Sequence, residues 1–414
     1  MDKLQEVYRL LLADPVITKG LAFIKGDQDK TLADQVALCE IPAPPFQEQK
    51  RAADFMERLQ ALGLKDIHLD QVGNVLGIRP GTGNGPKLVV AAHLDTVFPA
   101  GTDTSVKKRG GKLYAPGIAD DTRALAEILT IVRAFEHTGL ATIGDLIFCG
   151  DVGEEGLGNL RGVKQLFTDH RDIDGFISID GTGVSSITYQ ATGSYRYRIS
   201  YHGPGGHSFA AFGRPSAIHA LGRAIAQIAD IEPPEQPKTT FTVGVVEGGT
   251  AVNAIAAKAS MLVDLRSNGE EELKRLEKVL TDIVQGAALA ENKRWGSQEL
   301  QVQLERIGER PAGSQELKSP LVQVARASLK ALGLKAKLTE AGSTDANVPI
   351  SLGIPALAVG RGGKSGDSHS LNEWFDPTDA FLGPQKVFLM ILGLVGVKGL
   401  TKPLLPIHPA DKYS

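Results

Sequence analysis

The stretch that decides the fold is Lys87-Leu-Val-Val-Ala-Ala92, followed at once by His93-Leu94-Asp95-Thr96-Val97. A short, continuous apolar run of this kind predicts a buried strand, and the polar residues behind it then lie where the strand ends. Because ligands of open α/β sheets bind at the carboxyl ends of the strands, such endings are the first candidates for a functional site. Two later runs repeat the arrangement: Asp145 to Gly150 before Gly153-Glu154-Glu155-Gly156, and Gly175 to Ile179 before Asp180-Gly181.

Helical patterns separate these predicted strands. Between the first two, Leu125, Ile128, Leu129 and Val132 recur at the spacing of one helix face, which predicts a crossover helix. Strands alternating with helices in this way favour an α/β sheet covered by helices on both faces.

The order of predicted elements changes at about Gly193 and becomes β-α-β-β-α-β, which is the order of a ferredoxin-like (split βαβ) unit. The α/β pattern returns after about Glu309, with a buried strand at Pro355 to Val359. We therefore expect two domains in an α/β protein. An α/β domain consists of residues 1–190 and 309–414, and a smaller domain of residues 191–308 is inserted into it.

Composition narrows the classes of function. The chain has 414 residues, 42% hydrophobic and 22% charged, with a formal net charge of −3. It has no apolar run long enough to cross a bilayer and no basic stripe interleaved with aromatic residues, so we expect no membrane span and no nucleic-acid partner. Its first residues lack the pattern of a secretory signal, which favours a cytoplasmic protein. Cys39 and Cys149 lie in apolar stretches, where a buried, reduced thiol is expected.

Acidic and imidazole side chains gather at the predicted strand ends. Asp120-Asp121 precedes the crossover helix, and His369 lies beyond the Gly-rich loop after the strand at Pro355 to Val359. Carboxylates gathered this closely oppose folding unless a cation holds them. Imidazole and carboxylate ligands without a thiolate favour Zn²⁺, with Co²⁺ or Mn²⁺ as substitutes. We therefore expect a metal site at this edge, although Asp120 alone would be read as a helix cap.

Two spacings suggest how such a site works. Residues two apart leave a strand in the same direction, so Asp95 can reach the ring of His93 and fix its tautomer. The adjacent side chains of Glu154 and Glu155 diverge, so one can bind metal while the other faces a bound water. A base beside a metal-activated water is what hydrolysis requires.

Taken together, these motifs resemble those of the co-catalytic di-zinc peptidases that include carboxypeptidase G2, aminoacylase and peptidase T. The resemblance covers nearly the whole chain, since the order of the motifs and the point of insertion also agree. The motifs are His93-Leu94-Asp95-Thr96-Val97, Gly117-Ile118-Ala119-Asp120-Asp121, Gly153-Glu154-Glu155-Gly156, Ile179-Asp180-Gly181 and Ser368-His369-Ser370-Leu371-Asn372-Glu373.

The resemblance implies a role for each matching residue. Asp120 bridges two zinc ions, His93 and Asp180 complete one site, and Glu155 and His369 complete the other. It also implies that Glu154 is the general base and acid, that Asp95 orients His93, and that the Asp120–Asp121 peptide bond is cis.

The inserted domain resembles the lid of that family, which is also its dimerisation domain. His207, in Gly205-Gly206-His207-Ser208, resembles the histidine that crosses to the partner subunit and stabilises the oxyanion. Asn253 and Arg266 resemble the groups that hold the substrate carboxylate, for which an arginine fork is well suited. The resemblance thus implies a homodimer formed through residues 191–308.

Two departures from the family pattern bear on function. Thr122-Arg123 follows Asp121 where the family often has Lys-Gly or Lys-Ala-Gly, which puts the nearby substrate contacts in doubt. Asp180 stands where many deacylases and carboxypeptidases of the family have Glu, and this choice resembles the peptidase T branch.

From the resemblance we expect a zinc-dependent metallopeptidase or amidohydrolase, acting as an aminopeptidase on di- or tripeptides. An N-acyl amino acid deacylase or carboxypeptidase-like amidohydrolase is the alternative within the same class. An inactive peptide-binding relative is the non-enzymatic alternative, and the pair Glu154-Glu155 argues against it because a pure binding site needs no base.

Overall fold

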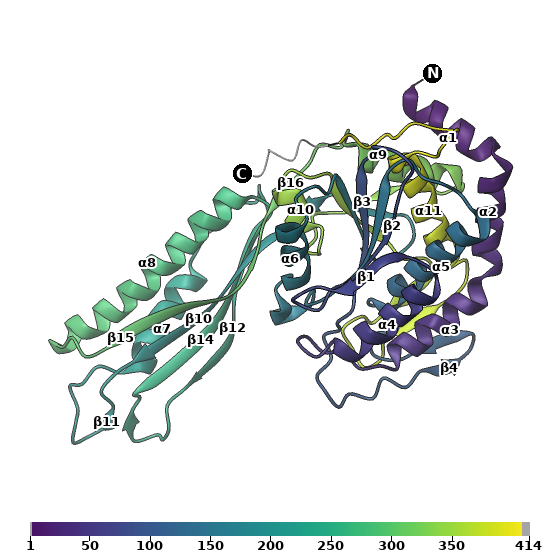
Figure 1. Ribbon diagram of the computed structural model, residues 1–414. Coiled ribbons are helices and arrows are strands. Elements are labelled where there is room, and N and C mark those ends of the chain that lie inside the picture. The colour runs from purple at the N-terminus through teal and green to yellow at the C-terminus, as the bar shows by residue number, and fades with distance from the viewer. Residues whose placement is uncertain (1, 408–414) are drawn as a thin grey trace. The chain divides into compact units, whose positions relative to one another are not determined.

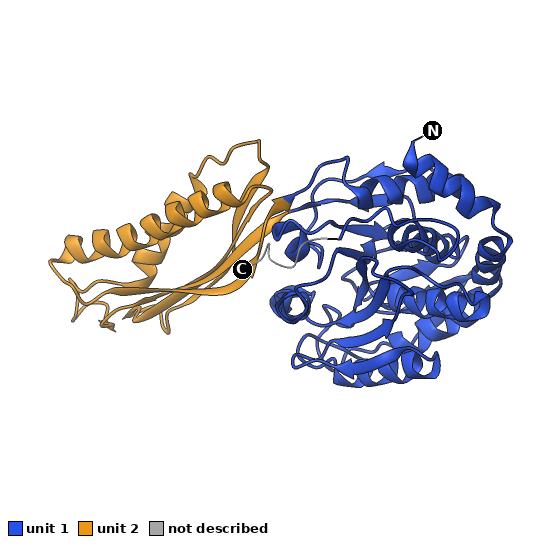
Figure 2. Cartoon of the chain, turned by 45° about the horizontal axis from the view of Figure 1, so that its top comes forward, with its two compact units in different colours: residues 1–191, 314–414 blue, residues 192–313 orange. Residues whose placement is uncertain are grey.

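The computed structural model describes residues 2–407, which form two compact units: residues 2–191 with 314–407, and residues 192–313 (Figure 2). The last residues assigned to the α/β domain, 408–414, lie outside the described part. Within the described part no helix has the length and apolar character needed to cross a membrane.

The first unit is built on one eight-stranded sheet, whose strand order is β1-β2-β6-β3-β7-β18-β8-β17. Figure 1 labels three of these strands, β1, β2 and β3. The central strands β6, β3, β7 and β18 are parallel. The strands are β1 (Lys65–Leu69), β2 (Val75–Arg79), β3 (Lys87–His93), β6 (Asp145–Asp151), β7 (Gly175–Gly181), β8 (Ser186–Thr188), β17 (Lys337–Leu338) and β18 (Ala356–Gly360).

Helices cover both faces of this sheet, because its central strands are apolar on both sides. In β3, Leu88 and Val90 belong to one core and Val89 and Ala91 to the other. The helices are α1 (Lys3–Ala13), α2 (Pro15–Gly26), α3 (Gln28–Cys39), α4 (Gln49–Ala61), α5 (Thr122–Thr138), α6 (Arg161–Asp169), α9 (Pro320–Ala331), α10 (Asn347–Ser351) and α11 (Leu382–Val395), with the 3-10 turn η1 (Gly156–Gly158). This arrangement confirms the predicted α/β class.

A small antiparallel sheet has the strand order β19-β20-β5-β4. The predicted ligand His369 lies between β19 and β20 in the sequence, and Asp120 follows β5. The strands of this sheet are β4 (Lys107–Arg109), β5 (Lys112–Tyr114), β19 (Lys364–Gly366) and β20 (Trp374–Asp376). These strands are short and alternate with loops, so the sequence shows no hydrophobic periodicity that would predict them. Two further short strands, β9 (Gln190–Ala191) and β16 (Gly313–Ser314), lie where the chain passes between the units.

The second unit is an antiparallel sheet with strand order β12-β14-β10-β15 and two helices packed on it. Its elements are β10 (Gly193–His202), β11 (Gly206–His207), α7 (Ala217–Ala229), β12 (Thr239–Gly248), β13 (Ala254–Ile255), β14 (Lys258–Ser267), α8 (Glu270–Trp295) and β15 (Gln301–Arg310). The chain order of its main elements is the predicted β-α-β-β-α-β. The boundary expected at residue 308 falls inside β15, because that strand pairs with β10 as far as Arg310.

Candidate metal centre and active site

The predicted site residues of the first unit come from the carboxyl ends of neighbouring strands. His93 ends β3 and is opposite Asp151, the last residue of β6, so the Glu154-Glu155 turn begins beside it. Asp180 lies near the end of β7, which pairs with the other side of β3. Asp120 comes from the loop that leads into α5. Parallel pairing therefore brings together residues that are far apart in the sequence.

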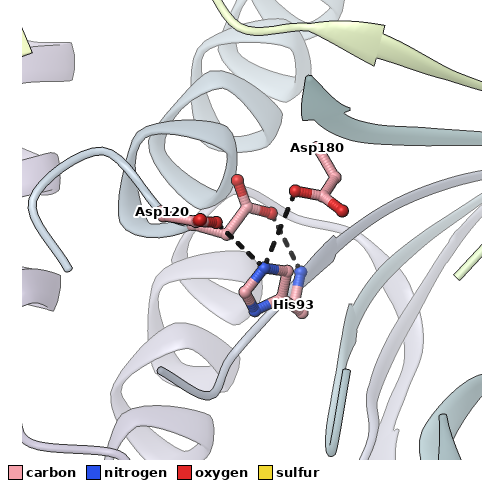
Figure 3. A group of neighbouring side chains, drawn as sticks. His93, Asp120 and Asp180 are labelled. Carbon is pink, nitrogen blue, oxygen red and sulfur yellow. Dashed lines mark hydrogen bonds and ion pairs between the residues drawn. The ribbon is translucent and has the colours of Figure 1, made fainter. Parts of the chain in front are cut away.

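The first cluster gathers His93, Asp120, Asp121 and Asp180, with one potential ligand atom from each within 4.8 Å of the others. Nε2 of His93 lies 3.2 Å from Oδ1 of Asp120 and 3.9 Å from Oδ1 of Asp180 (Figure 3). The His93 ring is only 1% exposed. The three residues assigned to the first metal thus converge around one buried nitrogen.

The second cluster consists of Asp120, Glu155 and His369. Nε2 of His369 lies 3.0 Å from Oε1 of Glu155 and 3.4 Å from Oδ2 of Asp120. Oδ1 of Asp120 faces His93, so the two carboxylate oxygens of Asp120 face different imidazoles. The peptide bond between Asp120 and Asp121 is cis, as the resemblance implied.

Both clusters fit a divalent metal in chemistry and in spacing. Their donors are imidazole nitrogens and carboxylate oxygens, the set that suits zinc and related ions. In a tetrahedral site with bonds of ~2.0 to 2.2 Å, neighbouring ligand atoms lie about 3.3 to 3.6 Å apart. The separations of 3.0 to 3.9 Å around His93 and His369 bracket that range.

Glu154 lies beside these candidate ligands, in a group that does not include Asp120. It is 5% exposed and clusters with His93 and Glu155. The carboxylate of Asp95 accepts hydrogen bonds from the backbone N–H groups of Glu154, at 3.0 Å, and Glu155, at 2.9 Å. Asp95 therefore fixes the turn that carries both glutamates.

The contact between Asp95 and His93 differs from the expected one. Nδ1 of His93 is 2.9 Å from the main-chain carbonyl oxygen of Asp95, whereas the nearer carboxylate oxygen is 3.7 Å away. The carboxylate is turned toward the two backbone N–H groups of the glutamate turn instead. The tautomer of His93 is thus set by the backbone of Asp95, because a carbonyl accepts only from a protonated Nδ1.

Two acidic residues of the quoted motifs, for which no role was predicted, support these side chains. Glu373 accepts hydrogen bonds from the backbone N–H groups of Gly117, Ala119 and Asp120, and so holds the loop that presents Asp120. Asp121 accepts from the N–H of His93 at 3.1 Å. The sequence offered a clue to Glu373, because it lies four residues after His369 in the motif His-Ser-Leu-Asn-Glu.

Arg123, which departs from the family pattern, is buried rather than directed at a substrate. Its Nε lies 2.9 Å from the carboxylate of Glu127, and it donates to the carbonyl of Ala380 at 2.8 Å. It is therefore part of the support of α5. A second arginine, Arg361, lies directly among the carboxylates of the first cluster. The sequence patterns did not predict this position.

The acidic surroundings raise the pKa values of both imidazoles in the protein without metal. Hydrogen bonds to Asp120 and Glu155 raise the pKa of His369 from 6.5 to about 10. Burial lowers the pKa of His93, but the neighbouring carboxylates, that of Asp121 first, outweigh it and leave the pKa well above its ordinary value. Burial raises the pKa of Asp180 to about 6. A site that favours cationic imidazoles in this way favours a metal cation that replaces their protons.

This gives a pH-dependent stability for the chelator-treated protein. Because the pKa of His369 is raised from 6.5 to about 10, its contribution to the free energy of unfolding is complete below pH 6.5 and is lost as the pH rises to 10. We expect urea denaturation to show that His369→Gln destabilises the metal-free protein at pH 6 and hardly at all at pH 10. An equal loss at both pH values would contradict the ion pairs of His369.

In the second unit, His207 and Asn253 lie side by side. His207, in β11, is opposite Ala254 of β13, and the N–H of Ser208 donates to the carbonyl of Asn253 at 2.9 Å. Nδ1 of the exposed His207 ring accepts from the N–H of Phe209 at 3.2 Å. This leaves the ring proton on Nε2, available to an outside acceptor.

Arg266 does not join them. It lies near the end of β14, where its Nε is 2.7 Å from Asp264, whereas Asn253 precedes the strand's first residue, Lys258. Lys258 and Arg266 are separated by about 26 Å at ~3.3 Å per residue. Asn253 therefore lies before the first residue of β14, whereas Arg266 lies near its last.

An α/β sheet with an inserted split βαβ unit, and with imidazoles and carboxylates at the carboxyl ends of its strands, fits the class of metallopeptidases and amidohydrolases. Within that class the chain belongs to the peptidase family M20/M25/M40, whose model matches residues 89–391. This confirms the resemblance stated from the motifs.

Proteins similar to this chain are named for more than one activity. A succinyl-diaminopimelate desuccinylase of Corynebacterium glutamicum is 24% identical over 79% of this chain and 87% of its own length. The structure of a tripeptidase from Staphylococcus aureus matches with a TM-score of 0.74 and 25% identity, covering 88% of this chain and 97% of that one. The aminopeptidase PepT from Bacillus cereus matches with a TM-score of 0.72 and 22% identity, over 88% and 98% of the two chains.

Proposed function

We propose that this protein is a two-metal hydrolase of amide bonds in small peptides, acting as a zinc-dependent aminopeptidase on di- or tripeptides. The observation that carries the proposal is the position of Asp120, whose two oxygens face His93 and His369 separately. A carboxylate placed in this way can join two ions in one site.

The residues present suit two zinc ions. His93 and Asp180 would hold one, Glu155 and His369 the other, and Asp120 both. Such ions, when bound, polarise the substrate carbonyl and make a water molecule more acidic. Co²⁺ and Mn²⁺ accept the same donors, so the choice among these ions is left to metal analysis.

Glu154 acts as the general base and acid. It is buried beside His93 and Glu155, where a carboxylate can exchange a proton with a water bound at the site. In the proposed reaction it takes the proton from the attacking water and returns it to the leaving amine. Asp95 keeps Glu154 in place through the backbone N–H of the glutamate turn.

We further propose a homodimer formed through the second unit, in which His207 of each chain stabilises the oxyanion in the other. Strand β12 forms an edge of its sheet and carries the exposed side chains of Val245 and Val246. An edge strand with exposed apolar side chains is suited to pair with another chain. Asn253 lies beside His207 and before the first residue of β14, whereas Arg266 lies near the last residue of that strand, so in this dimer the two substrate-binding residues at one site would come from different chains.

The substrate is tested by a direct comparison. Zinc-loaded protein is assayed by mass spectrometry with an unblocked tripeptide and with N-succinyl and N-acetyl amino acids, before and after chelation. The proposal expects a free amino acid from the tripeptide and no action after chelation. Cleavage of the N-acyl compounds alone would replace it with the deacylase function that the desuccinylase relative suggests.

An inactive peptide-binding relative would bind the tripeptide unchanged in the same assay. The buried Glu154 beside the ligand cluster argues against that role. A cytoplasmic location remains a prediction from the sequence.

A further inference from the structure

Arg361 is a permanent cation within the carboxylate cluster. Its side chain is 6% exposed, and Nη1 lies 3.0 Å from Oδ1 of Asp120 and 3.1 Å from Oδ1 of Asp121. Its Nη2 lies 3.6 Å from Oδ1 of Asp180. A guanidinium keeps its charge in proteins, so this positive charge is present whether or not a metal is bound.

The backbone around Arg361 is shaped for this position. A Cβ on Gly360 would lie 1.8 Å from the carbonyl oxygen of Gly183, and one on Gly362 would lie 1.9 Å from that of Ala380. Both neighbours of Arg361 must therefore be glycine. The loop after β18 can pass this close to two other segments only because side chains are absent on either side of the arginine.

Buried charged groups fasten the same loop. The N–H of Gly362 donates to Glu127 at 2.7 Å, and Glu127 is also paired with Arg123. The buried Lys386, from α11, donates to the carbonyl of Gly360. The position of Arg361 is thus fixed by interactions on both sides.

The number of carboxylates around the proposed metal site explains why a positive side chain is placed among them. The three ligand clusters contain five carboxylates: Asp120, Asp121, Asp180, Glu154 and Glu155. Two divalent ions neutralise four negative charges. Arg361 supplies the remaining positive charge, and it also partly neutralises the first cluster while no metal is bound.

We propose that Arg361 is a positioning residue and resident counter-cation, which holds Asp120, Asp121 and Asp180 together without metal and limits how tightly the first cluster binds a divalent ion. The inference rests on the proposed metal site but not on the reaction. Because Arg361 stabilises the metal-free carboxylates and repels an incoming dication, its removal strengthens metal binding while it destabilises the metal-free protein.

The test compares Arg361→Met, which removes the charge, with Arg361→Lys, which keeps it. Zn²⁺ affinity is measured by calorimetry with a competing chelator, and thermal unfolding is followed with and without Zn²⁺. We expect Arg361→Met to unfold at a lower temperature without metal and to bind the first Zn²⁺ about tenfold or more tightly. Arg361→Lys keeps the positive charge, so its Zn²⁺ affinity should stay closer to that of the unaltered protein than that of Arg361→Met.

Weaker or unchanged Zn²⁺ binding by Arg361→Met would overturn the inference. If that variant does not fold without metal, Arg361→Gln, which keeps hydrogen-bond donors and loses the charge, is titrated in its place with the same expectation. The unaltered protein separates the two claims: if it binds no Zn²⁺, the proposed function itself fails, whereas normal binding without tightening in the variants refutes the role of Arg361 alone.

Discussion

Glu154→Gln should lower turnover of a tripeptide by roughly 100-fold or more while the zinc content of the protein stays unchanged. The amide keeps the shape of the side chain but cannot accept the proton of the attacking water. The variant is measured by steady-state kinetics together with elemental analysis of the same preparation.

Two controls define the result. Glu136→Gln makes the same chemical change on α5 at a side chain that is 55% exposed, and it should leave activity unchanged. His93→Ala should lose metal and activity together, because it removes a ligand. Near-normal turnover by Glu154→Gln, or loss of zinc from it, would remove Glu154 from the role of base.

His207→Ala should lower turnover by about 10² to 10³, the usual loss when one oxyanion donor is removed. The Nε2 proton of His207 is the donor in question, since Nδ1 is used by the backbone of Phe209. Zinc content should not change, because His207 is in the second unit. His202→Ala, at another exposed histidine of that unit, is the matched control.

Mixing the two inactive variants tests where His207 acts. If His207 serves the partner's site, a hybrid dimer of His207→Ala and Glu154→Gln contains one site with both groups intact, and activity should partly return after subunit exchange. An active monomer, or no recovery despite demonstrated exchange, would contradict a role between chains.

The strand-end residues could be predicted because apolar runs mark both the strands and the points where they end. His93, Glu154 and Asp180 each follow or end such a run, so parallel pairing of the strands is enough to bring them together. The same reasoning gave the order of the second unit. The helical pattern over Glu271 to Val284, however, predicts only part of α8, because the helix continues to Trp295 through the buried residues Ala287, Ala288 and Glu291.

Other features depend on contacts that a linear pattern does not contain. Arg361 can reach the carboxylates only because two glycines let its loop approach the turn after β7 and the segment before α11, and the pattern of one strand says nothing of such an approach. Asp95 contacts His93 through its carbonyl because the glutamate turn takes its carboxylate. The distance of Arg266 from Asn253 follows from strand register, which the motifs alone did not fix.

If Asp120 joins two metal ions, anomalous diffraction at the zinc edge from crystals of the zinc-loaded protein will show both. We expect two peaks, one beside His93 and Asp180 and one beside Glu155 and His369, each ~2.0 to 2.2 Å from a different oxygen of Asp120. A single peak, or two peaks of which either lacks Asp120 as a ligand, would contradict it.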